Sequence, residues 1–374
     1  MDCTTLEPQP PLFTCGSLMQ IPFLRVTMWI LGISAVVGNL FVIAMRLRET
    51  PASVSATKQR LFIANLGASD SLMGIYMLII ASADLYYGND YFNYSEQWRS
   101  GVVCKIASFL ALLSSEASVF IITLISLDRC LSVAFPFSQL QLRGFSSKVT
   151  LCILWMASIA LALAPTLLAG PDSDYYDLSD VCVGLPLITR PSSFQIEVST
   201  VGNQLSDNNF DIPIPSDSKP AWYFSIAIFL GLNLVCFLII FMSYVTIFVY
   251  VKKSAKSAAR KQSNREEIKM AIKMAAVIGT DFLCWFPVII MGILSQTHLV
   301  VIPLVMYIWS VVFILPINSS LNPFLYTLLS AISDYRSKRV KKESMGSSIG
   351  SKSISGNRSI ASEKATAGTD ITST

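Results

Sequence analysis

Three carboxylic acids lie within long apolar segments of the chain: Asp70, Glu116 and Asp281. Charged groups are costly inside a bilayer, and those found there usually pair with one another or bind ions and ligands. Asp128 and Arg129 follow Glu116 near the end of the same apolar segment. These residue types favour charge pairing, hydrogen bonding and the binding of hard cations.

The sequence offers no comparable support for catalysis. Its single histidine, His298, has no neighbouring nucleophile and is expected to be solvated. No cluster of metal ligands and no glycine-rich phosphate loop after a strand is evident in the sequence. We therefore expect that the protein is not an enzyme, and that the charged residues in the apolar segments have a function other than catalysis.

The composition predicts that the segments with these charges cross a membrane and that the surplus of apolar residues faces lipid. The chain has 374 residues, of which 53% are hydrophobic and 14% charged, against about 25% charged in soluble domains. Seven apolar segments meet or approach the length that crosses a bilayer: Phe23–Met45, Leu61–Ala83, Val102–Val133, Leu151–Ala169, Ala221–Val251, Met270–Leu294 and Val301–Leu329. Since lipid cannot satisfy an open backbone, they should be helices. The predicted fold is an all-α bundle of seven transmembrane helices.

Basic residues predict the orientation. With the N-terminus outside, all but five of the 28 Lys and Arg residues fall on the inner side, as the positive-inside rule requires. Residues 1–22 then form an extracellular hinge-like segment, 23–329 the bundle of seven transmembrane helices, and 330–374 a cytoplasmic helix and a disordered Ser/Thr-rich tail. The tail is either passive or a phosphorylation-dependent docking site. No signal-peptide pattern opens the chain, so the first helix directs insertion or the natural precursor is longer.

Cysteines and one sequon mark the expected outer surface. Cys104 opens the third segment and Cys182 lies in the long loop after the fourth, so a bond between them would pin this loop over the bundle. Asn93 begins an outer glycosylation sequon. Cys3 and Cys15 either pair with each other or await absent partners. Four cysteines at membrane depth should stay reduced: Cys130, Cys152, Cys236 and Cys284.

Six short motifs follow one another, one set per expected helix: Gly38-Asn39, Asn65-Leu66 with Asp70, Asp128-Arg129-Cys130, Trp155, Cys284-Trp285-Phe286-Pro287 and Asn322-Pro323-Phe324-Leu325-Tyr326. Together they resemble the rhodopsin-like G-protein-coupled receptors. A narrower resemblance, to leucine-rich-repeat hormone receptors, rests on Asp281, Ser115-Glu116 and the Cys3–Cys15 segment. Residues 313–323 and Asp128 look most like relaxin receptors and related invertebrate orphans.

The chain also departs from that family. Cys130 replaces the usual tyrosine, and no leucine-rich repeat precedes the first helix. Relatives bind their hormone chiefly through such repeats. Either this is a truncated or spliced form, or its ligand binds the bundle directly.

The resemblance implies a switch in the sixth helix. An ion pair between Arg129 and Glu267 would hold that helix closed, and its rupture would let Arg129 receive a G protein. Tyr244 and Tyr326 resemble the tyrosines that rearrange beside this arginine. Three further residues would act in the same movement, Trp285 as an aromatic lever and Pro287 and Pro323 as points of flexure.

A polar core is expected at mid-membrane. Asp70, Ser118, Asn318 and Asn322 resemble a sodium site of relatives, and a water-filled network is the alternative. Asp281 lies one turn from Trp285 and is expected to accept hydrogen bonds from Asn318 and Asn322, which share a helix face.

The sequence thus predicts a plasma-membrane receptor that transmits a signal, from a peptide or protein hormone, to a heterotrimeric G protein. Arrestin and a kinase would bind the tail, and no cofactor is expected other than the sodium ion considered above. A transporter is the first alternative, but the sequence shows no inverted repeat. The second is a receptor-like membrane protein that binds partners without signalling.

Overall fold

The computed structural model describes a large part of the chain: residues 17–19, 21–50, 53–135, 137–138, 141, 144–168, 180–182, 193–196, 210–213, 224, 226–255, 262–296, 313–314 and 316–325. All of them lie in the first of two compact units, Met1–Leu325. The second unit, Tyr326–Thr374, lies outside the described residues. The predicted boundary near residue 329 and the predicted tail therefore stay predictions.

Five helices in the described part of the chain are long and apolar enough to cross a membrane. They are α1 (Pro22–Arg48), α2 (Val54–Tyr87), α4 (Val102–Ala134), α5 (Gly144–Leu168) and α7 (Leu234–Ala255), which continues the π-helical turn η4 (Ala227–Asn233). Helix α8 (Gln262–Gln296) contains a shorter apolar stretch, Val277–Met291. Of the seventh predicted segment, residues 316–325 are described and helical. The helices follow the order predicted from the apolar segments.

Local sequence sets where these helices start and stop. Helix α1 begins at Pro22, where a proline costs no hydrogen bond because the first-turn amides have no helical partner. Ser53 caps α2: its hydroxyl oxygen accepts a hydrogen bond from the Ala56 amide at 3.1 Å. Gly88, at φ +51°, ends α2 in a conformation that residues with a Cβ rarely adopt.

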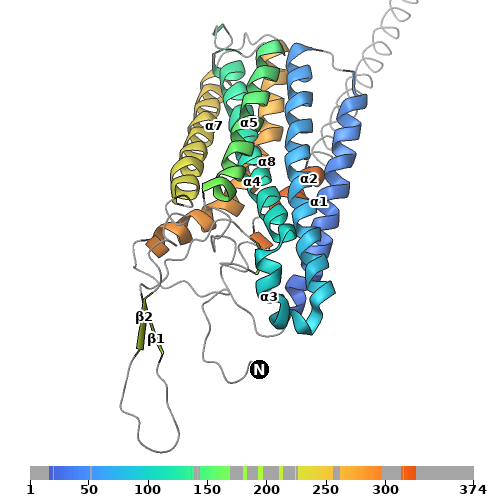
Figure 1. Ribbon diagram of the computed structural model, residues 1–374. Helices are drawn as coiled ribbons and strands as arrows, with labels where there is room; N and C mark the ends of the chain where they lie inside the picture. Colours follow the sequence, from blue (N-terminus) through green and yellow to red (C-terminus); the bar gives the residue numbers. More distant parts are fainter. Residues whose placement is uncertain are drawn as a thin grey trace, which may run out of the picture. The chain divides into compact units, whose positions relative to one another are not determined.

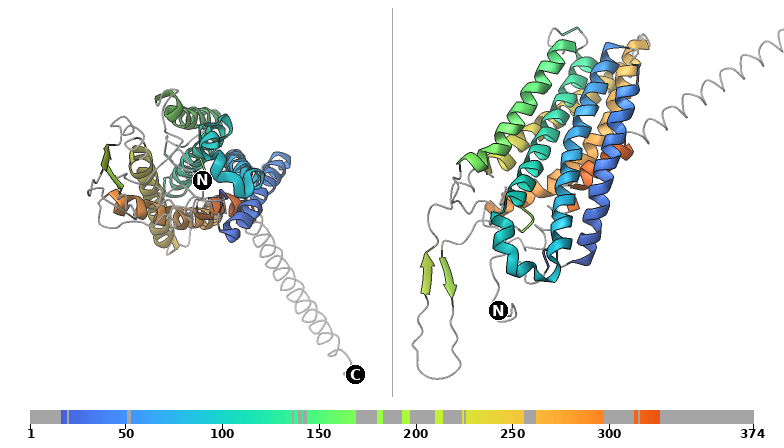
Figure 2. Two further views of the ribbon diagram at one scale, coloured as in Figure 1. Left: turned by 60° about the horizontal axis from the view of Figure 1, so that its bottom comes forward. Right: turned by 45° about the vertical axis from the view of Figure 1, so that its right-hand side comes forward.

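Helix α4 lies at the centre of the bundle, and α2 lies between α1 and α4 (Figures 1 and 2). Helix α4 contacts α2, α5, α7 and α8, whereas α1 packs mainly along α2. The α1–α2 approach is close at Gly74, where an added Cβ would lie 2.9 Å from the Ala35 Cβ and from the Gly32 carbonyl oxygen. The buried ionisable residues are consequently concentrated on α2 and α4, the helices with least contact to the surroundings.

Two features of the connecting segments were not predicted. A short polar helix, α3 (Tyr91–Ser100), follows α2 through the 3₁₀ turn η2 (Gly88–Asp90). Strands β1 (Ser193–Ile196) and β2 (Phe210–Pro213) pair antiparallel between α5 and η4. Long apolar runs predict membrane-spanning helices but give no signal for short polar elements. Neither α3 nor the strand pair was therefore predicted. The all-α expectation holds for the bundle, and this hairpin is an addition to it.

Candidate functional site

A disulfide joins Cys104, in the first turn of α4, to Cys182 in the segment after α5. The two Cα atoms are 5.3 Å apart, and both residues are almost fully buried. The predicted bond is thus confirmed. We call this end of the bundle, which also carries α3, the disulfide end. Cys3 and Cys15 lie outside the described residues, whereas the four cysteines expected to be reduced are all free.

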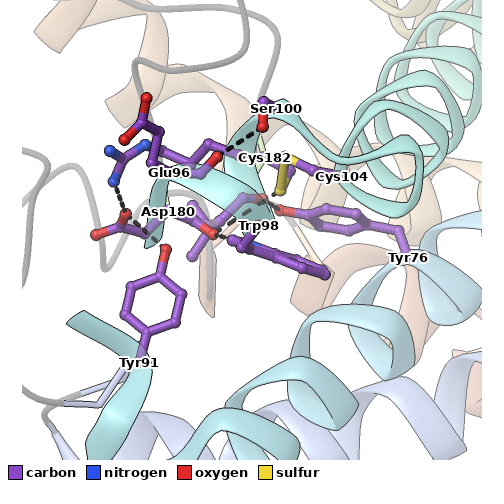
Figure 3. The surroundings of a disulfide bond; sticks show 10 residues. Tyr76, Tyr91, Glu96, Trp98, Ser100, Cys104, Asp180 and Cys182 are labelled. Carbon is purple, nitrogen blue, oxygen red and sulfur yellow. Dashed lines mark hydrogen bonds and ion pairs between the residues drawn. A yellow bond between two sulfur atoms is a disulfide. The ribbon is translucent and has the colours of Figure 1, made fainter. Parts of the chain in front are cut away.

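Asp180 fixes the segment beside this disulfide (Figure 3). Its carboxylate accepts a hydrogen bond from the Tyr91 hydroxyl at 2.7 Å and forms an ion pair with Arg99 at 3.0 Å. The Trp98 indole donates to the Asp180 carbonyl oxygen at 2.9 Å. Burial, together with the Asp180 charge, raises the pKa of the Tyr91 phenol, so the hydroxyl keeps its proton and remains a donor.

A second anchor on the same segment comes from α2. The Tyr76 hydroxyl donates to the Val181 carbonyl oxygen at 2.8 Å (Figure 3). Residues 180–182 are therefore held by α2, α3 and α4 together. The role of Asp180 was not predicted from the sequence. Its position two residues before Cys182 was the available signal.

Asp84, near the end of α2, anchors a different segment, the residues just before α1. Its carboxylate accepts a hydrogen bond from the Met19 amide at 2.8 Å and pairs with Arg25 of α1 at 2.6 Å. Leu18 and Met19 are buried against apolar residues of α1 and α2. Residues 17–19, just before α1, are thus docked on the disulfide end. The sequence analysis missed this contact, which joins residues far apart in the chain.

The predicted polar core lies between α2, α4, α8 and residues 316–325. Asp70 accepts hydrogen bonds from Asn322 at 2.8 Å and Ser319 at 3.1 Å, and Ser118 is a further partner. Asn318 donates to Asp281. All these side chains are buried.

One part of that prediction is wrong. Asn322 was expected to bond Asp281 but donates to Asp70 instead. Both amides lie on one helical face, as predicted, and each faces a different acid. Sequence spacing gives the shared face but does not give the relative heights of α2 and α8, which decide which acid each amide reaches.

Glu116 of α4 is fully buried and takes part in a separate contact. Its carboxylate accepts a hydrogen bond from Asn233 at 3.2 Å. Asn233 ends the π-helical turn η4, and such turns occur often at functional sites. The sequence indicated Glu116 but not its partner Asn233. A proline often marks an irregular turn in a helix, and η4 contains none.

The aromatic lever predicted on α8 lies in a ring cluster. Trp285 is buried, and its ring centroid lies 5.9 Å from that of Phe237 on α7. Phe237 also contacts Phe282, one turn earlier on α8. Pro287 lies within α8, and Pro323 lies within the helical residues 316–325. These rings join α7 to α8 beside the polar core.

At the opposite end of α4, Arg129 is buried and pairs with Asp128. Its guanidinium also lies 3.4 Å from the Ser55 hydroxyl of α2. The other carboxylate oxygen of Asp128 accepts from Lys58 of α2 at 2.6 Å. We call this end the arginine end. The sequence analysis did not single out Lys58, although a lysine on the apolar face of a helix was the available signal.

Several predicted members of the switch are only partly placed. Tyr244 lies on α7 beside a small cluster of Val133, Ile247 and Cys130, and its buried hydroxyl has no hydrogen-bond partner in the described part of the chain. The side chain of Glu267 and all of Tyr326 lie outside the described residues. The Arg129–Glu267 pair therefore stays a prediction. Asn93 is exposed on α3, where a glycan could be attached.

Comparison with known proteins agrees with this geometry. The family model described as "7 transmembrane receptor (rhodopsin family)" matches residues 38–326. The chain is 33% identical, over 323 residues, to the G-protein coupled receptor GRL101 of Lymnaea stagnalis, and the match covers 86% of this chain and 26% of that receptor.

Hormone receptors are among the further relatives. Human relaxin receptor 2 is 31% identical over 87% of this chain and 41% of its own length. The sheep thyrotropin receptor is 27% identical over 84% of this chain and 36% of its own length. The chain thus spans between about a quarter and two-fifths of the length of these relatives, all of which are named as receptors.

Proposed function

The chain belongs to the rhodopsin family of seven-transmembrane receptors, and we propose that it transmits an extracellular signal to a heterotrimeric G protein. The disulfide end faces the outside and the arginine end the cytoplasm, in the plasma membrane. The positive-inside bias of the sequence supports this orientation. The ligand is a peptide or protein hormone, as the names of the relaxin and thyrotropin receptors suggest.

The observation that carries the proposal is the burial of Arg129. Arg129 is 1% exposed, and its pairing with the adjacent Asp128 offsets the cost of desolvating both charges only in part, so the pair contributes little net stability and can open when a partner binds. In the active state α8 moves away from α4, Arg129 leaves Asp128, and the opened cavity receives the G protein. Trp285, Pro287 and Pro323 allow this movement, while Tyr244, Glu267 and Tyr326 take part at the arginine end.

The experiment is nucleotide exchange on purified G proteins, with the receptor in lipid discs. Arg129→Ala should abolish exchange, because the residue serves coupling more than folding, while surface expression is largely retained. A matched control is Arg46→Ala, which removes an arginine from an exposed pair with Glu49. Exchange that survives in Arg129→Ala would contradict the proposal.

The second candidate is a receptor-like protein that binds partners without signalling. Cys130 supports it, because this residue follows Arg129 where the family usually has tyrosine. Absence of exchange in the unmodified chain, across a panel of G proteins, would favour this candidate. Arrestin and kinase binding to the Ser/Thr-rich tail belongs to the first proposal and is tested by phosphorylating the tail.

The polar core also fits a hard cation. The amide oxygens of Asn318 and Asn322 and one oxygen of Asp281 accept no hydrogen bond from other described residues. Carboxylate, hydroxyl and amide oxygens are suited to sodium, and Asp70, Ser118, Asn318 and Asn322 would hold it. The ion would neutralise Asp70, and water would satisfy the same oxygens. Thermal stability in sodium chloride and in choline chloride distinguishes the two.

A further inference from the structure

Asp128 is shared between two cations. One carboxylate oxygen pairs with Arg129, its neighbour on α4, and the other with Lys58 on α2 at 2.6 Å. The lysine is 6% exposed and both other residues are 1% exposed. Water screens the three charges little at this depth, so each cation affects how strongly the carboxylate holds the other.

The inward position of Lys58 requires an explanation. It lies in the second turn of α2, close to the helix start after Ser53. A lysine so near a helix end can normally extend its ammonium group to the membrane surface and into water. Lys58 instead shares the buried face of α2 with Phe62 and Leu66, four and eight residues further on. Lysine is almost never buried without a charged partner, and Asp128 is that partner.

The two cations contribute differently to a conformational change. Arg129 is the residue that leaves Asp128 in the proposed active state, whereas Lys58 belongs to a different helix and keeps its own carboxylate oxygen. When Arg129 leaves, Lys58 still neutralises Asp128, which would otherwise be a buried charge without a partner. While Arg129 is bound, the two cations repel each other across the carboxylate. Both effects disfavour the resting state relative to the active state.

We infer that Lys58 is a positioning residue that eases the release of Arg129, and so sets the basal activity of the receptor. This inference rests on the proposed coupling function and goes beyond it, since it assigns a regulatory role to a buried residue of α2 that acts through Asp128. A different role, in which Lys58 merely ties α2 to α4 in the resting state, predicts the opposite sign. Loss of a simple tie would raise basal activity.

The test is Lys58→Met, which keeps an unbranched side chain of most of the same length and removes its charge. Basal nucleotide exchange, normalised to folded receptor, should fall on the order of tenfold, within the usual range of coupling between two states. Lys58→Arg should restore much of the exchange. The matched control is Arg60→Met on the same helix, where the arginine contacts the Glu49 carbonyl oxygen and not Asp128. This control should leave basal exchange unchanged.

A second readout does not depend on any G protein. Cys130 is a free, half-buried thiol next to Arg129, and opening of the arginine end should expose it. Its alkylation rate, followed by mass spectrometry, should fall in Lys58→Met and should no longer respond to this change in an Asp128→Asn background. If the unmodified receptor shows no exchange, the coupling function fails, and the alkylation rate still tests the role of Lys58.

The alkylation rate of Cys130 in Lys58→Met decides the role of Lys58. Slower alkylation of Cys130 in Lys58→Met, accompanied by lower exchange where the receptor couples and with Arg60→Met unaffected, supports the inference. An increase in either readout shows that Lys58 is a simple tie and overturns it. No change in the alkylation rate also overturns it, because sharing of Asp128 must then have no effect on the release of Arg129.

Discussion

At the disulfide end, each buried acid is surrounded by donors that fix its position, whereas at the arginine end one acid is shared by two cations. Asp180 binds Tyr91 and Arg99 beside a covalent bond, and Asp84 binds the Met19 amide and Arg25. Asp128 instead holds Lys58 and Arg129 with no covalent support. The two ends thus use the same residue types in different ways.

The difference lies in what each carboxylate connects. At the disulfide end the two carboxylates tie residues 17–19 and 180–182 to helices α1, α2 and α3, so more contacts mean less freedom. At the arginine end the partners are side chains of two helices, and one cation can leave while the other stays. We therefore expect changes at the disulfide end to alter stability, and changes at the arginine end or in the polar core to alter basal activity.

The largest expected effect is at the disulfide. Replacing both Cys104 and Cys182 by serine should lower the free energy of unfolding by roughly 4 kcal/mol, because the bond closes a loop between residues 78 apart in sequence. Surface expression and thermal unfolding in detergent measure the loss. The control is Cys152→Ser, which changes a free and exposed thiol on α5. Unaltered stability in the double variant would show that the non-covalent anchors suffice at this end.

The next effect is the loss of one donor to Asp180. Tyr91→Phe removes a buried hydrogen bond to a carboxylate, which typically contributes about 1.5–3 kcal/mol. Thermal unfolding should show a loss of about 2 kcal/mol, with basal exchange per folded receptor unchanged. Tyr76→Phe is the matched change, since its hydroxyl donates to a neutral carbonyl oxygen, and should cost about 1 kcal/mol. Equal losses would mean that the charge of Asp180 is of little importance.

The sequence predicted what depends on local pattern. Apolar length gave the order of the helices, and the two cysteines gave the disulfide because topology placed them on one side of the membrane. The spacing of Asn318 and Asn322 gave their shared face, and Asp281 was correctly matched with the first of them.

What the sequence could not give is contact between distant segments. Lys58 and Asp128 are 70 residues apart, and Met19 and Asp84 are 65 apart. Whether such side chains meet depends on the rotation and relative height of neighbouring helices, which hydrophobic periodicity fixes only loosely. Asn322 illustrates this limit, since both Asp70 and Asp281 were chemically suitable acceptors.

The last expected effect, about as small in free energy as the loss of the Tyr76 hydrogen bond, concerns the polar core between the two ends. Asp281 on α8 accepts a hydrogen bond from Asn318, and both side chains are buried. This contact ties α8 to the helical residues 316–325, and we propose that it favours the resting state. Asp281→Ala removes the tie and should raise basal exchange about tenfold, which corresponds to about 1.4 kcal/mol.

Two further variants decide whether the contact acts in this way. Asp281→Asn keeps a carbonyl oxygen that can accept from Asn318, so it should raise basal exchange less. Asn318→Ala should reproduce the effect of Asp281→Ala, and the double variant should add little to either, because both single changes break the same bond. If Asp281 were only structural, Asp281→Ala would lower expression without increasing exchange per folded receptor. Equal or lower exchange in that variant would therefore end the hypothesis, and the polar core would then resemble the disulfide end in fixing the fold without setting the activity.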